Sequence, residues 1–381
     1  MHRIPLSLYI HFPWCVQKCP YCDFNSHRQI GSIPTSYTTA LCHDLKTHMP
    51  INRPIETIFL GGGTPSLYPT KELAKLLAHI KAHYPIAPQA EITLEANPGT
   101  IEHGQFIEYR KMGITRISLG AQTFCPDTLK MLGRIHRSQD IPNAVEAIKK
   151  AGFDNFNIDI MHGLPRQTAD QAVDDLKKAC QLGPTHLSWY QLTIEPNTAF
   201  WANPPTLPDE ATLTAIERNG LDYLKDQHFL PYEVSAYAQS DQYQCQHNLN
   251  YWTFGDYIGI GAGAHSKLTD TTTGTITRIQ KHRNPKLYLA AQHHWGQKTW
   301  SIQMPEEIAY EFLFNALRLQ NGFSEMLFTQ RTGLSIGHIA QPLKIGVQRG
   351  LLTWNESWIC PTPFGRQFLN DCLQLFTPST D

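Results

Sequence analysis

Three cysteines close together are the most informative residues for chemistry in this sequence of 381 residues. Cys15, Cys19 and Cys22 are separated by three and then two residues. Thiolates at this spacing can bind one small metal centre, but a structural zinc site requires four ligands, usually from two separated pairs. Three thiolates on a cubane iron–sulfur cluster leave one iron open to a small molecule. The motif therefore predicts a [4Fe-4S] cluster bound by these three cysteines, with one exchangeable position.

The remaining six of the nine cysteines do not form a second motif. They occur singly, and an odd number spread thinly over a long chain does not indicate a disulfide framework. We interpret them as ordinary buried thiols. A disulfide plus a spare thiol is accordingly a weaker interpretation of the clustered cysteines.

The composition predicts a cytoplasmic globular protein. Hydrophobic residues make up 41% of the chain, which is enough for a sizeable core, and charged residues make up 17%. The net charge is -1 and there is no basic stripe, so nothing favours a nucleic-acid partner. The first residues do not resemble a secretory signal, and no run of 18 apolar residues predicts a membrane span.

The first half of the chain alternates between β-rich runs and helical patterns. Strands are predicted at 7–12, 57–62, 91–97, 116–122, 155–161 and 186–192, with helices such as 70–84 and 141–152 between them. This alternation predicts βαβ units and a parallel sheet, for which an α/β, partial, open (βα)6 barrel is the leading interpretation and a doubly wound sheet the alternative. Either architecture places a ligand at the carboxyl ends of the strands.

Polar and glycine residues stand at those predicted strand ends. The cysteine loop follows the first strand, and the run GGGTPS at 61–66 follows the second. Its glycines suggest a close backbone approach to a ligand with exposed amides, and Thr64 offers a hydroxyl. A plain βα turn is the alternative for this run. The later strands end at Glu95, Gln122, Asp159 and Thr193.

The last part of the chain predicts a separate helical module. Helices are expected at 306–319, 323–331 and 336–349, then a hairpin within 350–362 that turns at Asn355-Glu356, and a final helix. This order resembles a winged helix. Because no basic face supports DNA binding, we expect a lid or a docking module.

The cysteine spacing, together with its place after a predicted strand, resembles the radical S-adenosylmethionine (SAM) superfamily. The resemblance implies that the amino and carboxylate groups of SAM chelate the open iron. It also implies that an electron donor reduces the cluster, so that SAM is cleaved to a 5′-deoxyadenosyl radical. The implied division of the chain is a radical SAM core at 1–235, a linking segment at 236–300 and a C-terminal domain at 301–381.

Longer runs narrow the resemblance. YIHFPWCVQKCPYCDFNS, FLGGGTPS, LEANPGT, ISLGAQTF and NIDIMHGLP are similar to oxygen-independent coproporphyrinogen III dehydrogenase and to its relatives, the HemW heme chaperones. Motif by motif, the resemblance implies a set of SAM-binding residues. They are Tyr9, Gly62, Gly63, Thr64, Glu95, Gln122, Arg134, Asp159 and, less securely, Thr193.

Two departures and one motif favour the chaperone over the dehydrogenase. Phe24 occupies the place of the fourth cysteine of the dehydrogenase, and the cluster loop begins too early to leave room for an N-terminal extension. The HNxxYW motif of the chaperones stands at 247–252. It implies that His247 binds heme iron beside Tyr251 and Trp252. Substitute ligands remain open among the histidines at 228, 265, 282, 293 and 294.

The sequence thus predicts a heme chaperone with a SAM-binding cluster. Its expected partners are heme and acceptor apo-hemoproteins, which include respiratory membrane enzymes as candidates. The first alternative is a coproporphyrinogen III oxidase that decarboxylates its substrate through the deoxyadenosyl radical. The second alternative is a radical SAM enzyme that acts on an unrelated substrate.

Overall fold

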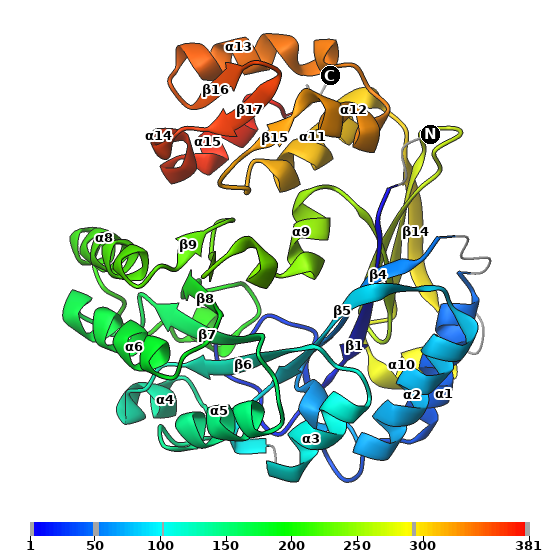
Figure 1. Cartoon of the computed structure of the whole chain (residues 1–381), viewed down its shortest axis with the longest axis vertical. Helices are drawn as coiled ribbons and strands as arrows, with labels where there is room; N and C mark the ends of the chain where they lie inside the picture. The colour runs from blue at the N-terminus through cyan, green and yellow to red at the C-terminus, as the bar shows by residue number, and fades with distance from the viewer. Residues whose placement is uncertain (1–3, 49–52, 101–102, 292–294, 378–381) are drawn as a thin grey trace.

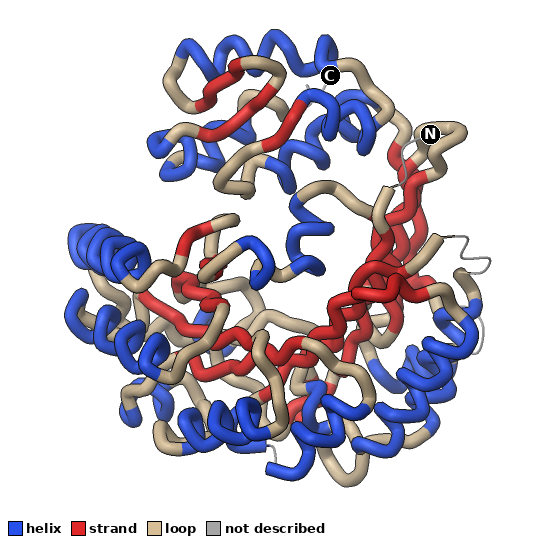
Figure 2. The backbone as a smooth tube through the Cα atoms, viewed as in Figure 1, coloured by secondary structure: helices blue, strands red, loops and turns tan. Residues whose placement is uncertain are grey.

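The computed structural model describes residues 4–48, 53–100, 103–291 and 295–377. Within these residues, the main feature is a strongly curved sheet of twelve strands in the order β14-β13-β12-β11-β1-β4-β5-β6-β7-β8-β10-β9. Figure 2 shows helices along the outer side of this curve, and the C-terminal module lies across one open end. Among the described helices, none is long and apolar enough to cross a membrane.

The six strands predicted in the first half of the chain are present, and each pairs in parallel with the next. They are β1 (Leu6–Phe12), β4 (Ile55–Gly62), β5 (Ile86–Ala96), β6 (Arg116–Gln122), β7 (Phe156–His162) and β8 (His186–Gln191). Every residue of β6 is buried, as expected for a strand covered on both faces. The predicted α/β class with a partial barrel is confirmed.

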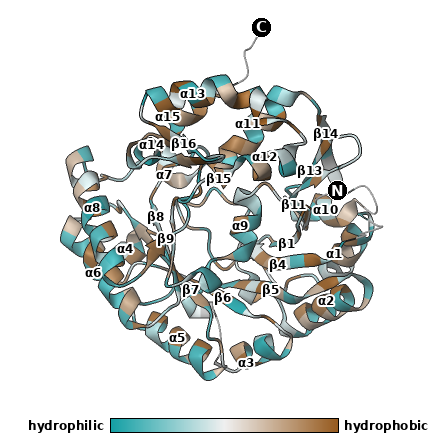
Figure 3. Ribbon diagram, turned by 45° about the horizontal axis from the view of Figure 1, so that its top comes forward, coloured by the Kyte–Doolittle hydropathy of each residue, from teal (hydrophilic) through white to brown (hydrophobic). Residues whose placement is uncertain are grey.

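The outer helices cover the convex face of the sheet (Figure 1). They include α1 (Ser36–Lys46), α2 (Thr70–His83), α3 (His103–Lys111), α4 (Pro126–Met131), α5 (Asp140–Lys150), α6 (Ala169–Gln181) and α8 (Glu210–Asp226). In α2, Leu73, Leu76, Leu77 and Ile80 recur at helical spacing and are buried, so one stripe of the helix faces the sheet. Figure 3 shows such mixed hydropathy along the outer helices.

The segment expected to link the two domains belongs to the sheet instead. It supplies β11 (Asp256–Ile260), β12 (His265–Thr269) and β13 (Ile276–Lys281), and β14 (Gly296–Ile302) follows. Strand β11 pairs in parallel with β1 and so covers an edge that would otherwise be open. The other three strands continue the sheet in antiparallel order. A division of the chain into domains at residues 235 and 300 is still a proposal, because the segment between them supplies strands to the main sheet.

The C-terminal module has its own hydrophobic core. It consists of α11 (Pro305–Ala316), β15 (Phe323–Ser324), α12 (Glu325–Thr332), α13 (Ala340–Gln348), β16 (Leu352–Asn355), β17 (Trp358–Pro361), α14 (Pro363–Gln367) and α15 (Leu369–Gln374). The ring of Phe312 lies 5.0 Å from Phe323 and 5.2 Å from Phe328 between ring centres. The hairpin turns at Glu356 and Ser357, one residue later than predicted.

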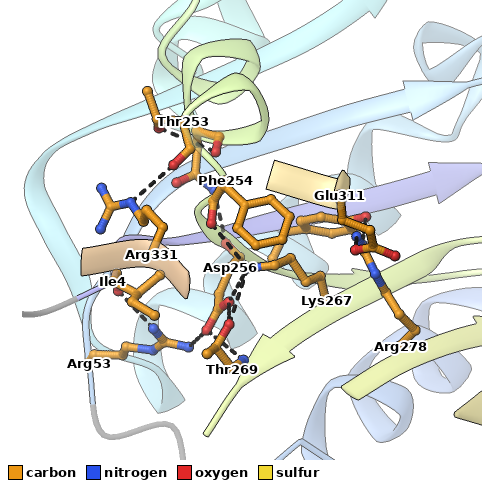
Figure 4. Close-up of polar contacts among 12 residues, drawn as sticks. Ile4, Arg53, Thr253, Phe254, Asp256, Lys267, Thr269, Arg278, Glu311 and Arg331 are labelled. Atoms are coloured by element: carbon orange, nitrogen blue, oxygen red, sulfur yellow. Dashed lines mark hydrogen bonds and ion pairs between the residues drawn. The ribbon is translucent and has the colours of Figure 1, made fainter. Parts of the chain in front are cut away.

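Paired charges lie within the sheet and between the sheet and the C-terminal module (Figure 4). The Asp256 carboxylate accepts a bond from Lys267 Nζ at 3.0 Å and also contacts the Arg53 guanidinium. Burial raises the pKa of Asp256, but Lys267 and Arg53 outweigh burial and hold it below its ordinary value. On β13, which pairs with the strand that holds Lys267, Arg278 forms an ion pair with Glu311 of α11. The Arg278–Glu311 pair therefore connects an edge strand to the module, whereas the Asp256 pairs connect segments of the sheet side.

Candidate functional site

A cavity of about 150 Å³ lies at the carboxyl ends of the parallel strands. Its lining includes Cys15, Cys19, Cys22, Gly62, Gly63, Thr64, Glu95, Gln122, Arg134 and Asp159. The sequence placed these residues on separate strand ends and loops, and the fold brings them to one cavity. We refer to it as the cluster cavity.

The three cysteine thiols line the cluster cavity from one side. Cys15 is buried, with its Sγ 3.7 Å from the carbonyl oxygen of His27, and burial raises the pKa of its thiol. The Sγ of Cys22 lies 3.5 Å from the Ser26 hydroxyl. Among the described residues, no three His, Cys, Asp or Glu side chains are grouped to hold a single metal ion. Three thiols that share one cavity in this way suit the separate corners of a larger cluster.

The glycine turn after β4 approaches the cysteine loop closely. Gly62 has φ +117, and a Cβ on Gly63 would lie 2.5 Å from the carbonyl oxygen of Trp14, so neither position suits another residue. The sequence predicted exposed amides in this turn, and that prediction is wrong. The Gly63 amide donates to the Phe12 carbonyl oxygen at 2.7 Å, and the Thr64 amide donates to the Trp14 carbonyl oxygen at 2.7 Å. These bonds hold the turn against the loop, and its amides are therefore not free to bind a ligand.

Two carboxyl groups face the cluster cavity from β5 and β7. Glu95 Oε2 accepts a bond from the Gly62 amide at 3.0 Å, and Asp159 accepts one from Asn157 Nδ2 at 2.6 Å. Burial and, secondarily, the nearby Asp159 raise the pKa of Glu95 to about 8. Burial also raises the pKa of Asp159. A cation or a hydroxyl donor entering the cavity would favour the anionic forms of both groups.

Arg134 connects the cysteine loop to the strand ends. Its Nη2 donates to the carbonyl oxygen of Gly120 at 2.5 Å and to the Asn97 side chain, and its Nη1 lies 3.9 Å from Cys19 Sγ. The buried Nε has no hydrogen-bond partner among the described residues. A buried donor without a partner is costly, so this arginine is suited to an anionic ligand such as a carboxylate.

Sequence reasoning missed several residues of this cavity, and two of them contact predicted site residues. Tyr190 donates to Gln122 Oε1 at 2.6 Å, and Asn97 Nδ2 donates to the Thr64 hydroxyl at 2.9 Å. Asn97 stands in the LEANPGT run and Tyr190 near the end of the sixth predicted strand. Because both residues lie at or near predicted strand ends, that position is the sequence signal that could have identified them. Thr193, in contrast, is exposed and is not part of the cavity lining.

A second cavity, of about 450 Å³, adjoins the first. The two share Phe24, Gly62 and Glu95 as lining residues. Tyr9 lines the second cavity, where its hydroxyl lies 3.0 Å from His11 Nδ1. Other lining residues include Asn25, Tyr251, Tyr257, His265, Gln280 and Arg283. We refer to it as the aromatic cavity.

His247 lies behind the aromatic cavity and does not line it. His247 is the second residue of α9 (Gln246–Trp252), which lies on the inner side of the curved sheet (Figure 1). Its Nδ1 lies 2.7 Å from the Thr57 hydroxyl, and its Nε2 lies 3.0 Å from the Tyr251 hydroxyl. The side chain is buried, which lowers its pKa to about 3. The ring is therefore neutral, but both of its nitrogens are already hydrogen-bonded.

Comparisons with known proteins match this arrangement over the whole chain. The radical SAM superfamily model matches residues 9–179, and the HemN C-terminal domain model matches residues 304–368. Proteins named Heme chaperone HemW from Haemophilus influenzae and Escherichia coli are 46% and 45% identical, and 98% of each chain is covered. The structure of coproporphyrinogen III oxidase (HemN) from Escherichia coli superposes with a TM-score of 0.83. That match has 22% sequence identity and covers 98% of this chain and 90% of the other, so it shows the fold.

Proposed function

This chain belongs to the HemW family of heme chaperones, and we propose from this premise that it binds heme and transfers it to apo-hemoproteins. The observation that supports this proposal best is the pair of adjoining cavities. One is lined by three thiols, as a cluster requires, and the other is lined by aromatic rings, as a porphyrin requires. Because the cavities share lining residues, the cluster and the heme would lie side by side.

The radical SAM domain implies a [4Fe-4S] cluster and SAM as cofactors. We propose that Cys15, Cys19 and Cys22 hold the cluster. The unpartnered Nε of Arg134 supports its assignment to the SAM carboxylate. When bound, the reduced cluster supplies the electron that cleaves SAM.

The remaining SAM contacts follow from the polar groups of the cluster cavity. Glu95 and Asp159 would accept bonds from the ribose hydroxyls or the ammonium group, and Gln122 would bridge sugar hydroxyls. Because the amides at Gly62, Gly63 and Thr64 are bonded within the protein, this turn would offer carbonyl oxygens to the ammonium group. Tyr9 would close the boundary to the aromatic cavity. The exposed position of Thr193 gives it the weakest support in the set.

The proposed partners are heme, an electron donor for the cluster, and acceptor apo-hemoproteins that lie in the cytoplasm or at a membrane that borders it. Respiratory membrane enzymes are the proposed acceptors. The relatives named as heme chaperones support the general role, and the identity of the acceptor is part of the proposal.

The second candidate function is oxidative decarboxylation of coproporphyrinogen III, because the oxidase has the same fold. Phe24 argues against it, since this side chain replaces the extra cysteine of the oxidase and lies between the two cavities with 65% of its surface exposed. A single anaerobically reconstituted sample can be assayed for both functions. We expect a heme spectrum and no turnover. Formation of protoporphyrinogen that depends on SAM and reductant would favour the oxidase.

A further inference from the structure

The aromatic cavity has the properties that a heme site requires. A heme needs apolar surfaces against its faces, a donor atom for its iron and cations for its carboxylates. Tyr9, Tyr251 and Tyr257 supply aromatic surface, and the rings of Tyr251 and Tyr257 are perpendicular at 4.7 Å. A cavity of about 450 Å³ falls within the range of roughly 300–1,000 Å³ that is typical of ligand pockets.

Among the described residues, two histidines line this cavity, and the ring of one of them has no hydrogen-bond partner there. His11 Nε2 lies 2.8 Å from the carbonyl oxygen of Asn25, and its Nδ1 is bonded to the Tyr9 hydroxyl. His265 stands at the start of β12 with its side chain exposed, and no described residue hydrogen-bonds either of its ring nitrogens. Its pKa lies below the ordinary value, chiefly through desolvation, so the ring is neutral and carries a lone pair.

A free cation stands at the same wall. Arg283, just after β13, lines the cavity with an exposed side chain and forms no ion pair with any described residue. Arg278, by comparison, is already occupied by the Tyr257 hydroxyl at 2.8 Å and by Glu311. Arg283 is therefore the guanidinium available to a carboxylate in this cavity.

We propose that heme occupies the aromatic cavity, with His265 as an axial ligand of the iron and Arg283 bound to a heme carboxylate. This proposal rests on the proposed heme-binding function and names its site. His247 then has a different role, because its ring fixes the Tyr251 hydroxyl at 3.0 Å and so holds one wall of the cavity. The HNxxYW motif shapes the cavity, and the ligand comes from the GAGAHS run at 261–266.

The test is titration of cluster-reconstituted protein with ferric heme under anaerobic conditions, followed by the Soret band. We expect His265→Ala to shift the band and to weaken binding by at least the roughly tenfold that loss of an outer-shell metal partner costs. Added imidazole should restore the parent spectrum, which it would not do for a purely structural defect. Arg283→Ala should weaken binding with the band unchanged.

The matched control is His282→Ala, which removes a neighbouring histidine outside the cavity lining. It should keep the parent spectrum and affinity. If His265→Ala keeps both while the parent binds heme, or if His282→Ala shifts the band instead, the assignment of His265 is wrong. If the parent protein itself shows no Soret band, the proposed function fails, which is a separate result.

Discussion

The Nε2 atom of His247 lies 3.0 Å from the Tyr251 hydroxyl, and the two rings meet nearly at a right angle, at 87°. Its other nitrogen lies 2.7 Å from the hydroxyl of Thr57 on β4. Residue 247 therefore ties α9 to the inner face of the sheet. A histidine held at both nitrogens is well suited to positioning a neighbour and poorly suited to ligating iron, which would require one bond to break.

The first prediction concerns this pair of bonds. His247→Ala should lower the free energy of unfolding by about 2–4 kcal/mol, because it leaves a cavity and two buried hydroxyls without their partner. Urea denaturation followed by circular dichroism measures the change. His338→Ala, at an exposed site, is the control and should change stability by less than about 0.5 kcal/mol. Equal effects of the two substitutions would contradict the structural role of His247.

The second prediction concerns the cluster. Cys19→Ser should remove most of the iron, since two thiolates are then left for a whole cubane. Cys125→Ser is the matched control, because Cys125 is also partly exposed but is not part of the cluster cavity. Iron and sulfide analysis after anaerobic reconstitution measures both. Full iron content in a triple Cys15, Cys19 and Cys22 to serine variant would refute the assignment.

The third prediction concerns SAM. Arg134→Ala should weaken SAM binding by about 1.5–3 kcal/mol, roughly ten- to more than a hundredfold, if a charge-assisted bond is lost. Because Arg134 Nη1 lies 3.9 Å from Cys19 Sγ, the iron content of the variant must be measured with the affinity. Arg137→Ala, whose side chain is 87% exposed, should bind SAM as the parent does. If Arg134→Ala holds a full cluster and binds SAM with unchanged affinity, Arg134 does not contact SAM.

The fourth prediction concerns pH. The pKa of Glu95 rises from its ordinary 4.5 to about 8 on folding, so between these values the folded protein binds more protons than the unfolded chain. Its contribution to stability therefore falls as pH rises from 4.5 towards 8, by at most about 1.4 kcal/mol per pH unit. Unfolding of the cluster-free protein at pH 5 and pH 8 should show a smaller loss for Glu95→Gln than for the parent. An equal loss in both proteins would show that Glu95 is ionised at neutral pH.

The sequence predicted the parallel half of the sheet well, because most strands there are buried apolar runs separated by helical patterns. It did not predict β11, because Gly259 within the strand and the glycines at 261 and 263 just after it hide the strand pattern. That strand becomes clear only when the open edge of β1 is known to need a partner.

For the candidate site, the sequence predicted most of the residues but not their hydrogen bonds. The cysteine spacing predicted the cluster ligands, and the family resemblance implied most of the other residues that the fold brings to the cluster cavity, where strand ends meet at one edge of a parallel sheet. The hydrogen-bond state of each side chain was not predictable. That the amides of the glycine turn are bonded internally, or that His247 forms two hydrogen bonds and His265 forms none with the residues that the structure describes, depends on contacts between distant segments.

The central claim is that this protein delivers heme, and its most direct test is a transfer measurement. Heme-loaded, cluster-reconstituted protein is mixed with membranes whose respiratory enzymes lack heme, and the cytochrome spectrum is followed against an equal amount of free heme. We predict faster and more complete loading from the protein, with a matching loss of its own Soret band. Loading no faster than from free heme, or heme that stays on the protein, would contradict the account.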